Sequence, residues 1–290
     1  MPESAGSPSP YACDPDDAVY FDVECSPGRW LVGFYGPDER GVMTVFQVDG
    51  DVDLLRRVLD RLARQGKTLF GYNSYSYDMN MIRAILGNRD AYTTSRAIIE
   101  AGRLPRDERR RIDLRGCPKI AVDHVDLAAR LKKGGNFPGL KTVAANLCLP
   151  VLRELPFEPD RLQTDEEWAQ GKPYNANDLE ITRAVHEVYV PELRAMAALS
   201  SEHKLDLRST SKSAAVGRIF KKIYAEAHDG REPDVPERPA EVVYRPVPGV
   251  RRPRTPDAAS WFDLVVNRPI RVPSRGKPKP EVPSATFDVG

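Results

Sequence analysis

A short stretch near the N-terminus, Tyr20-Phe21-Asp22-Val23-Glu24-Cys25, places two acids inside an apolar sequence that favours a buried strand. Successive side chains of a strand point to opposite faces, so Asp22 and Glu24 lie on the same face. Two like charges side by side destabilise a strand unless a cation lies between them. Two interpretations are open: the acids hold a divalent metal ion through their oxygens, or they form the solvated face of an edge strand.

The first third of the chain alternates short strands and helices in a pattern typical of an α/β fold. Short turns connect the first three predicted strands, which therefore form an antiparallel meander. A helix follows, and the next strand then joins the sheet in parallel. The predicted elements are strands at 19–24, 30–35 and 42–48, a helix at 51–65, a strand at 68–72 and a helix at 79–86. We predict a central mixed β-sheet flanked by helices.

The rest of the chain is predicted from its apolar pattern and its prolines. We expect a strand at 122–127, a helix at 140–147 and a loop at 150–173, with a candidate short helix at 165–169. Pro173 is typical of a helix start, so a helix is predicted at 174–199, kinked or divided by Pro191. A basic helix is predicted at 203–227, where six Lys and Arg side chains precede Glu226.

Composition divides the chain into four expected segments. Residues 1–17 are predicted to be a disordered leader without the basic start and apolar centre of a signal peptide. The main domain is expected over 18–200, and a basic helical segment over 201–230. A Pro-rich basic extension covers 231–290 and holds 12 of the 26 prolines. Within it, 261–266 is a predicted strand with 269–272 as a candidate partner. The extension suits a docking strap, or simple disorder.

Several classes of protein are disfavoured by the sequence. No apolar run approaches a membrane span, and the four scattered cysteines show no zinc spacing. We therefore expect a protein of a reducing cytoplasm, with free thiols and no membrane partner. The formal net charge is only +1, but positive charge gathers in 103–119 and 204–222. These two segments are either phosphate contacts or solvated surface.

Three further side chains supply what a metal site near Asp22 and Glu24 would need. Asp78 follows a predicted strand and begins a helix, whereas Tyr174 and Asp178 are four residues apart and share one helix face. Each has a structural alternative: Asp78 caps its helix, and Asp178 interacts with the helix dipole. Four converging carboxylates would repel one another, and divalent cations would remove that cost.

These motifs together resemble the three exonuclease motifs of the DEDD superfamily, in order along the chain. The motifs are Asp22-Val23-Glu24, then Gly71-Tyr72-Asn73-x-x-x-Tyr77-Asp78, then Tyr174-Asn175-x-x-Asp178, and Pro138-Gly139-Leu140-Lys141 resembles a helix start common in these domains. The tyrosine four residues before the last acid is similar to the DEDDy branch, which includes proofreading domains of family A and family B DNA polymerases. The second motif most resembles the family B version. The resemblance covers about residues 18–200 and implies a ribonuclease-H-like fold.

The resemblance implies a metal-dependent 3′–5′ exonuclease that releases 5′-nucleotides. Asp22, Glu24, Asp78 and Asp178 would hold two Mg²⁺ or Mn²⁺ ions, and Tyr174 would orient the attacking water. Asn73 and Tyr77 would help place either the terminal nucleotide or the junction between sheet and helix. Cys25-Ser26-Pro27 departs from the apolar lining that usually contacts the terminal base, which leaves that contact unassigned.

The expected partner is single-stranded DNA or a frayed 3′ end. No acidic palm motif follows residue 200, so the resemblance also implies a stand-alone nuclease or a partner of a separate DNA polymerase subunit, in the host cytoplasm if the chain is phage-encoded. Two alternatives remain open: a 3′–5′ exoribonuclease on the same fold, and a non-catalytic nucleic-acid-binding replication module.

Overall fold

A computed structural model describes residues 11, 13–104, 112–132, 137–231, 241–243 and 269–271. The chain divides into two compact units. The first comprises Met1–Arg103 and Arg110–Gly230, and the second comprises Leu104–Arg109 and Arg231–Gly290. All of the predicted site residues belong to the first unit.

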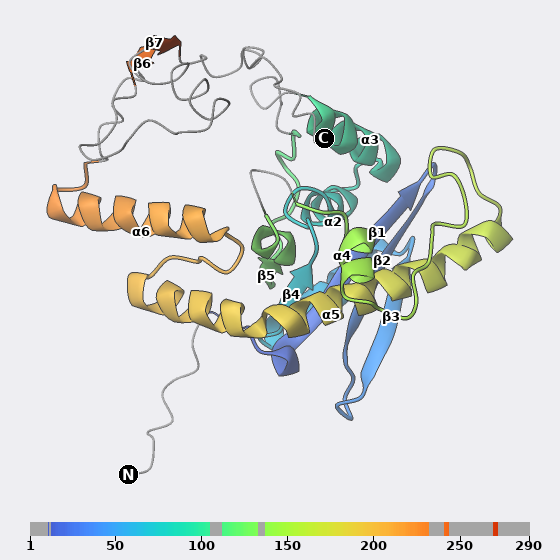
Figure 1. Ribbon diagram of the computed structural model, residues 1–290. Coiled ribbons are helices and arrows are strands. Elements are labelled where there is room, and N and C mark those ends of the chain that lie inside the picture. The colour runs from blue at the N-terminus through green and yellow to red at the C-terminus, as the bar shows by residue number, and fades with distance from the viewer. Residues whose placement is uncertain are drawn as a thin grey trace, which may run out of the picture. The chain divides into compact units, whose positions relative to one another are not determined.

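A five-stranded mixed sheet forms the centre of the first unit (Figure 1). Its strands are β1 (Ala18–Ser26), β2 (Arg29–Pro37), β3 (Met43–Asp49), β4 (Thr68–Gly71) and β5 (Asp123–Asp126), in the order β3-β2-β1-β4-β5. The β1, β2 and β3 strands pair antiparallel, whereas β4 pairs parallel with both β1 and β5. The predicted α/β class, with an antiparallel meander extended by parallel strands, is confirmed and agrees with a ribonuclease-H-like fold.

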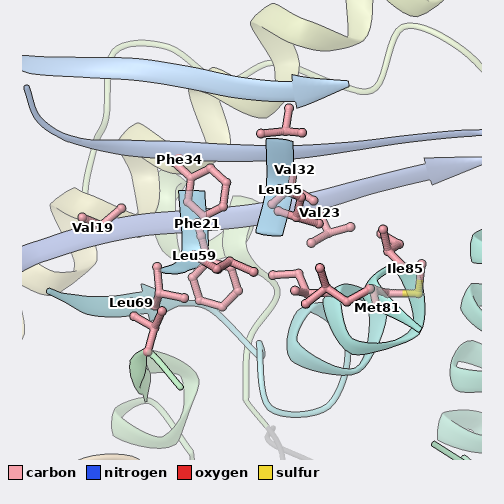
Figure 2. Close-up of a cluster of buried hydrophobic side chains, with 14 of the residues drawn as sticks. Val19, Phe21, Val23, Val32, Phe34, Leu55, Leu59, Leu69, Met81 and Ile85 are labelled. Carbon is pink, nitrogen blue, oxygen red and sulfur yellow. The ribbon is translucent and has the colours of Figure 1, made fainter. Parts of the chain in front are cut away.

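One face of this sheet is covered by the first three helices. They are α1 (Val52–Arg64), α2 (Asp78–Leu86) and α3 (Ala91–Arg103). Alternate residues of β1, namely Val19, Phe21 and Val23, point into this core, as Figure 2 shows. Leu55 and Leu59 of α1 pack there because they are four residues apart on one face of the helix.

The opposite face packs against α5 (Asp165–His203) and α4 (Leu140–Asn146). Ala18 and Tyr20 of β1 point into this second core, where they meet Leu179 and Val185 of α5. β1 is therefore buried on both faces. Asp22 and Glu24 continue the row formed by Ala18 and Tyr20, so the fold directs both acids toward α5.

The structure corrects the prediction for α5. The prolines predict a helix that begins near Pro173 and is kinked or divided at Pro191. The helix instead runs without a break from Asp165 to His203, so the start near Pro173 and the division at Pro191 are wrong. Its start is set by Thr164, whose side chain accepts from the Glu167 backbone while Glu167 accepts from the Thr164 backbone. Buried Trp168 anchors this first turn by donating from Nε1 to Asp49 at 3.0 Å.

Three other predictions change. Cys13 is buried and a 3₁₀ helix covers Pro15–Asp17, so the expected disordered leader is wrong for residues 13–17. The α3 helix was not predicted. The last helix of the first unit, α6 (Lys212–Ala227), begins nine residues after the expected start at His203, because the chain first crosses to β5, where Arg208 binds Asp123.

The second unit contributes two described strands, β6 (Glu241–Val243) and β7 (Pro269–Arg271), which pair antiparallel. The predicted strand at 261–266 lies outside the described residues, as do residues 1–10 of the leader. The expected strand at 269–272 is present as β7, but it pairs with β6. Among the described helices, none is both long enough and apolar enough to cross a membrane.

Candidate metal centre

Three carboxylates from two elements converge on one point at the face of the sheet. One oxygen each of Asp22, Glu24 and Asp178 lies within 4.8 Å of the others. The first two come from β1, and Asp178 comes from α5, which crosses this face of the sheet (Figure 1). The strand alternation and the helix spacing therefore bring three of the predicted ligands together.

Asn175 fixes how α5 approaches β1. This fully buried side chain donates from Nδ2 to Asp22 Oδ2 at 2.9 Å, and its Oδ1 accepts from Gln47 Nε2 at 3.0 Å. Gly33 of β2 is paired with Asp22 and makes this approach possible. A Cβ at residue 33 would lie 2.8 Å from Asn175 Cγ, closer than real side chains pack. The absent side chain of Gly33 is thus a requirement of the site.

Asp78 approaches β1 from its flank. β1 pairs with β4 only over Ala18–Tyr20, so the strand continues beyond this neighbour. There, Asp78 Oδ1 accepts from the Val23 backbone N–H at 3.0 Å. The Asp78 side chain is buried. Burial and the charges of Asp22 and Asp178 raise the pKa of Glu24, and the charge of Asp78 adds to this effect. The fourth predicted ligand is therefore beside the cluster, with one oxygen bonded to the strand.

Burial and mutual repulsion make these carboxylates weak acids. Burial raises the pKa of Asp22 to about 6, with a further contribution from the charge on Asp178. The pKa values of Glu24 and Asp78 rise well above their usual range, first because of burial and then because of Asp22. A bound cation would oppose both causes, since it stabilises the ionised form of every group. The donor set therefore fits a divalent cation with hard oxygen ligands.

Lys141 is a member of the site that sequence reasoning did not assign. Its ammonium forms an ion pair with Asp178 and lies over the Tyr174 ring, 4.4 Å from the centroid. Burial raises the pKa of Asp178, and Lys141 opposes this effect. The signal available in the sequence was the position of Lys141 in the first turn of a helix beginning Pro-Gly-Leu-Lys. Lys141 and Asp178 are 37 positions apart in the sequence, so no pattern within a single element predicts their contact.

Tyr174 lies between the acids and an open cavity. Burial, the neighbouring carboxylates and a hydrogen bond to Asp178 all raise the pKa of Tyr174, so its hydroxyl keeps its proton at neutral pH. The cavity beside it has a volume of about 400 Å³ and is lined by Arg153, Glu154, Pro156, Gln170, Pro173 and Tyr174. Tyr174 is thus placed where a neutral hydroxyl can donate to, or accept from, a molecule bound beside the acids.

Asn73 and Tyr77 belong to the turn that leads into α2. Asn73 has a positive φ of 58°, and its backbone N–H donates to Asp126 Oδ1 at 2.9 Å. Asp126 also accepts from the Tyr75 backbone at 3.1 Å. The Tyr77 hydroxyl bonds Ser95 of α3 at 2.7 Å, and the ring packs against the first core. The structure therefore shows these residues shaping the turn before Asp78. Asp126, at the end of β5, was not predicted to take part.

The two basic segments differ in the structure. Arg208, counted in the sequence among the basic residues of a helix, is only 1% exposed and precedes α6. It binds Asp123 through two nitrogens, at 2.6 and 2.7 Å, and also pairs with Asp206. Its role is to hold the chain against β5, so the idea that it contacts phosphate is wrong. Residues 105–111 of the other basic segment lie outside the described residues.

Comparison with solved structures finds a likeness to a polymerase. The chain is similar to the family B DNA polymerase from the hyperthermophilic archaeon Pyrobaculum calidifontis, at 18% sequence identity and a TM-score of 0.45. The match covers 78% of this chain and 31% of the polymerase. No family model matches the sequence, and no curated protein does.

Proposed function

We propose that this protein is a metal-dependent 3′–5′ exonuclease that hydrolyses the terminal phosphodiester of single-stranded or frayed DNA. The observation that carries the proposal is the convergence of Asp22, Glu24 and Asp178, with Asp78 bonded to the strand between the first two. The order and spacing of the motifs, which resemble the DEDDy exonucleases, support the same function. All the acids that this chemistry requires are retained, which argues against a non-catalytic module.

Asp22, Glu24, Asp178 and Asp78 would hold two Mg²⁺ or Mn²⁺ ions. When bound, such ions lower the pKa of a water ligand and stabilise the charge that develops at phosphorus. The chain's own groups orient the reactants. Tyr174 keeps its proton, so its hydroxyl orients a water molecule rather than serving as a base. Asn175 holds the Asp22 carboxylate in place by donating to one of its oxygens.

The burial of the acids supports the proposed substrate class. Asp178 is buried and Asp22 and Glu24 are half-buried, so a paired strand end would have to separate from its complement to reach them. Single strands and mismatched ends should therefore be hydrolysed faster than paired ends. A separate DNA polymerase subunit is the partner that would supply such frayed ends.

Hydrolysis of a 5′-labelled single strand tests this function. With Mg²⁺ or Mn²⁺ we expect a ladder that shortens from the 3′ end, and with EDTA we expect none. Asp22→Asn and Asp178→Asn should each reduce hydrolysis to background, because each removes a ligand charge while keeping the side-chain shape. Asp53→Asn, a change to an exposed acid of α1, is the matched control and should retain full activity. An RNA strand run in parallel distinguishes the exoribonuclease alternative.

Metal binding is tested separately from activity. Mg²⁺ at one hundred times its dissociation constant should stabilise the fold by about 2.7 kcal/mol, since it binds only the folded state. Thermal melting with and without Mg²⁺ measures this gain, and Asp178→Asn should abolish most of it. If both ligand variants kept the full activity and the full metal-dependent stabilisation, the proposed site would be wrong.

A further inference from the structure

A second cavity in the first unit shares no residue with the acidic cluster. Its volume is about 610 Å³, and it lies between α2 and the turn that precedes β5. The lining residues are Arg83, Ile112, Asp113, Leu114, Arg115, Gly116, Cys117 and Lys119. Arg83 is five residues after Asp78 on α2, which is about 7.5 Å along the helix axis. Five residues also turn the chain by about 140°, so the cavity lies on another side of α2 than Asp78 and its lining is separate.

The rim of this cavity is cationic. Among the described residues that line it, Arg83, Arg115 and Lys119 are cationic and Asp113 carries the one carboxylate. Asp113 is already engaged, because it accepts from Arg115 through the backbone at 3.0 Å and through the guanidinium at 2.9 and 2.8 Å. Arg115 nevertheless has a side chain that is 91% exposed, which leaves its other face open to solvent. An anion at the rim would have three cationic side chains near it.

Arg83 is held in place to face the cavity. Its Nε donates to the Pro118 carbonyl at 3.2 Å, and its Nη2 donates to the Leu114 carbonyl at 3.5 Å. A guanidinium has five N–H donors, so donors remain after these two bonds. Within the described part of the chain, neither Arg83 nor Lys119 has a carboxylate partner. Both are consequently available to a phosphate.

The floor of the cavity is apolar. Leu114 and Cys117 pack against Ala84 of α2, and Ile112 is packed against the same cluster. A cationic rim above an apolar floor matches a nucleotide unit, whose phosphate is charged and whose base and sugar present apolar surface. A simple inorganic anion would make no use of the floor.

We propose that this cavity binds a nucleotide unit of the same single strand whose 3′ end is hydrolysed at the acids. The inference rests on the proposed function, because the strand that the cavity binds is the substrate of that function. The cavity would be a second contact, which raises affinity for longer strands and leaves the chemistry at the acids unchanged. Part of the strand's affinity should therefore come from ionic contacts at Arg115 and Lys119, and it should weaken with salt.

Binding of a 5′-fluorescein oligothymidylate in EDTA tests the proposal, with fluorescence anisotropy as the readout. EDTA prevents hydrolysis, so the measurement does not depend on the proposed activity. The double variant Arg115→Gln/Lys119→Gln should weaken binding about 2- to 30-fold at low salt. The slope of log affinity against log salt should fall by about 1.4, since each phosphate contact to a single strand contributes about 0.7.

Arg57→Gln/Arg64→Gln on α1 removes the same charge from surface that does not line the cavity, and it is the matched control. It should leave the affinity and the slope nearly unchanged. The proposal is overturned if the cavity variant binds the strand as the unaltered protein does, or if both double variants weaken binding equally. Titration with thymidine 5′-monophosphate is a second arm: loss of that binding alone, with the strand unaffected, would assign the cavity to free nucleotides instead.

Failure of this proposal and failure of the proposed function give different results. A protein that binds the strand through the cavity but never hydrolyses it would overturn the exonuclease and keep the cavity. An active exonuclease whose affinity for the strand is unchanged by Arg115→Gln/Lys119→Gln would keep the proposed function and overturn the cavity proposal. Circular dichroism on each double variant checks the fold, and Lys119→Gln alone provides a milder variant with an expected slope change of about 0.7.

Discussion

Gly33→Ala is the sharpest test of how the acidic cluster is assembled. The new methyl group would lie 2.8 Å from Asn175 Cγ and 3.0 Å from Leu179 Cδ1, and still closer to Asn175 Oδ1. Asn175 is fully buried and hydrogen-bonded on both sides, so it cannot move without losing its bond to Asp22. Overpacking costs about 1–3 kcal/mol, and the hydrogen bond to a charged group is worth about 1.5–3 kcal/mol. We expect a loss of about 2.5–6 kcal/mol.

A double-mutant cycle separates the clash from any other effect of the alanine. In an Asn175→Ala background the methyl group no longer meets the amide, so Gly33→Ala should cost about 1–3 kcal/mol less than it does alone. The assay is urea unfolding of the four proteins in EDTA. Gly102→Ala is the matched control, because a Cβ at that α3 position meets nothing within 4 Å. If the two changes at residues 33 and 175 were additive, the reasoning about this contact would be refuted.

Three other expectations concern the acids and their supports. Because Asp22 has a folded pKa of about 6 against a usual 3.8, the folded state keeps its proton longer, so Asp22 alone should lower the stability of metal-free protein by up to about 3 kcal/mol as pH rises from about 4 to about 6. The raised pKa values of Glu24 and Asp78 change stability in the same direction. Urea midpoints in EDTA measure this, and a rise over that window would contradict it. Arg208→Ala should lower the free energy of unfolding by about 2–4 kcal/mol. Arg208→Lys should not restore this stability, because one ammonium cannot replace the bidentate contact to Asp123. Thermal melting of both variants measures the two effects. Asp126→Ala should free the backbone donors of Asn73 and Tyr75 and weaken Mg²⁺ binding, measured by calorimetry; unchanged Mg²⁺ affinity would show that the turn before α2 is held by other contacts.

Local patterns were sufficient to predict the elements that carry the acids. The alternation of β1 predicts that Asp22 and Glu24 share a face, and the four-residue spacing predicts that Tyr174 and Asp178 share a helix face. Both predictions agree with the structure. These patterns depend on contacts within a single element, which a sequence expresses directly.

Partners that come from distant segments were not predictable in the same way. Lys141 reaches Asp178, Asn175 reaches Asp22, and in each case only the packing of a helix on the sheet joins them. The α3 helix escapes prediction for a different reason. Of its thirteen residues only Ala91 and Ser95 are buried, so it lacks the apolar stripe by which an amphipathic helix is recognised.

The proline positions are misleading for α5. A proline is well tolerated in the first turn of a helix, so Pro173 by itself indicates a start. The Thr164-x-x-Glu167 capping box lies nine residues earlier and is the stronger signal, because it satisfies backbone donors at both of its residues. Trp168 packs against Leu31 and Phe157, and this packing stabilises the first turn of α5. The positions of the prolines alone do not predict this turn.

The bond from Val23 to Asp78 has a practical consequence for anyone who needs an inactive protein with an intact fold. Asp78 replaces a missing strand neighbour, so truncating it removes a backbone partner as well as a charge. Asp78→Ala would mix a folding defect with a loss of metal binding. Asp78→Asn keeps an oxygen acceptor for Val23 while removing the charge. The amide is therefore the substitution with which to trap a bound strand, and the alanine is the one to avoid.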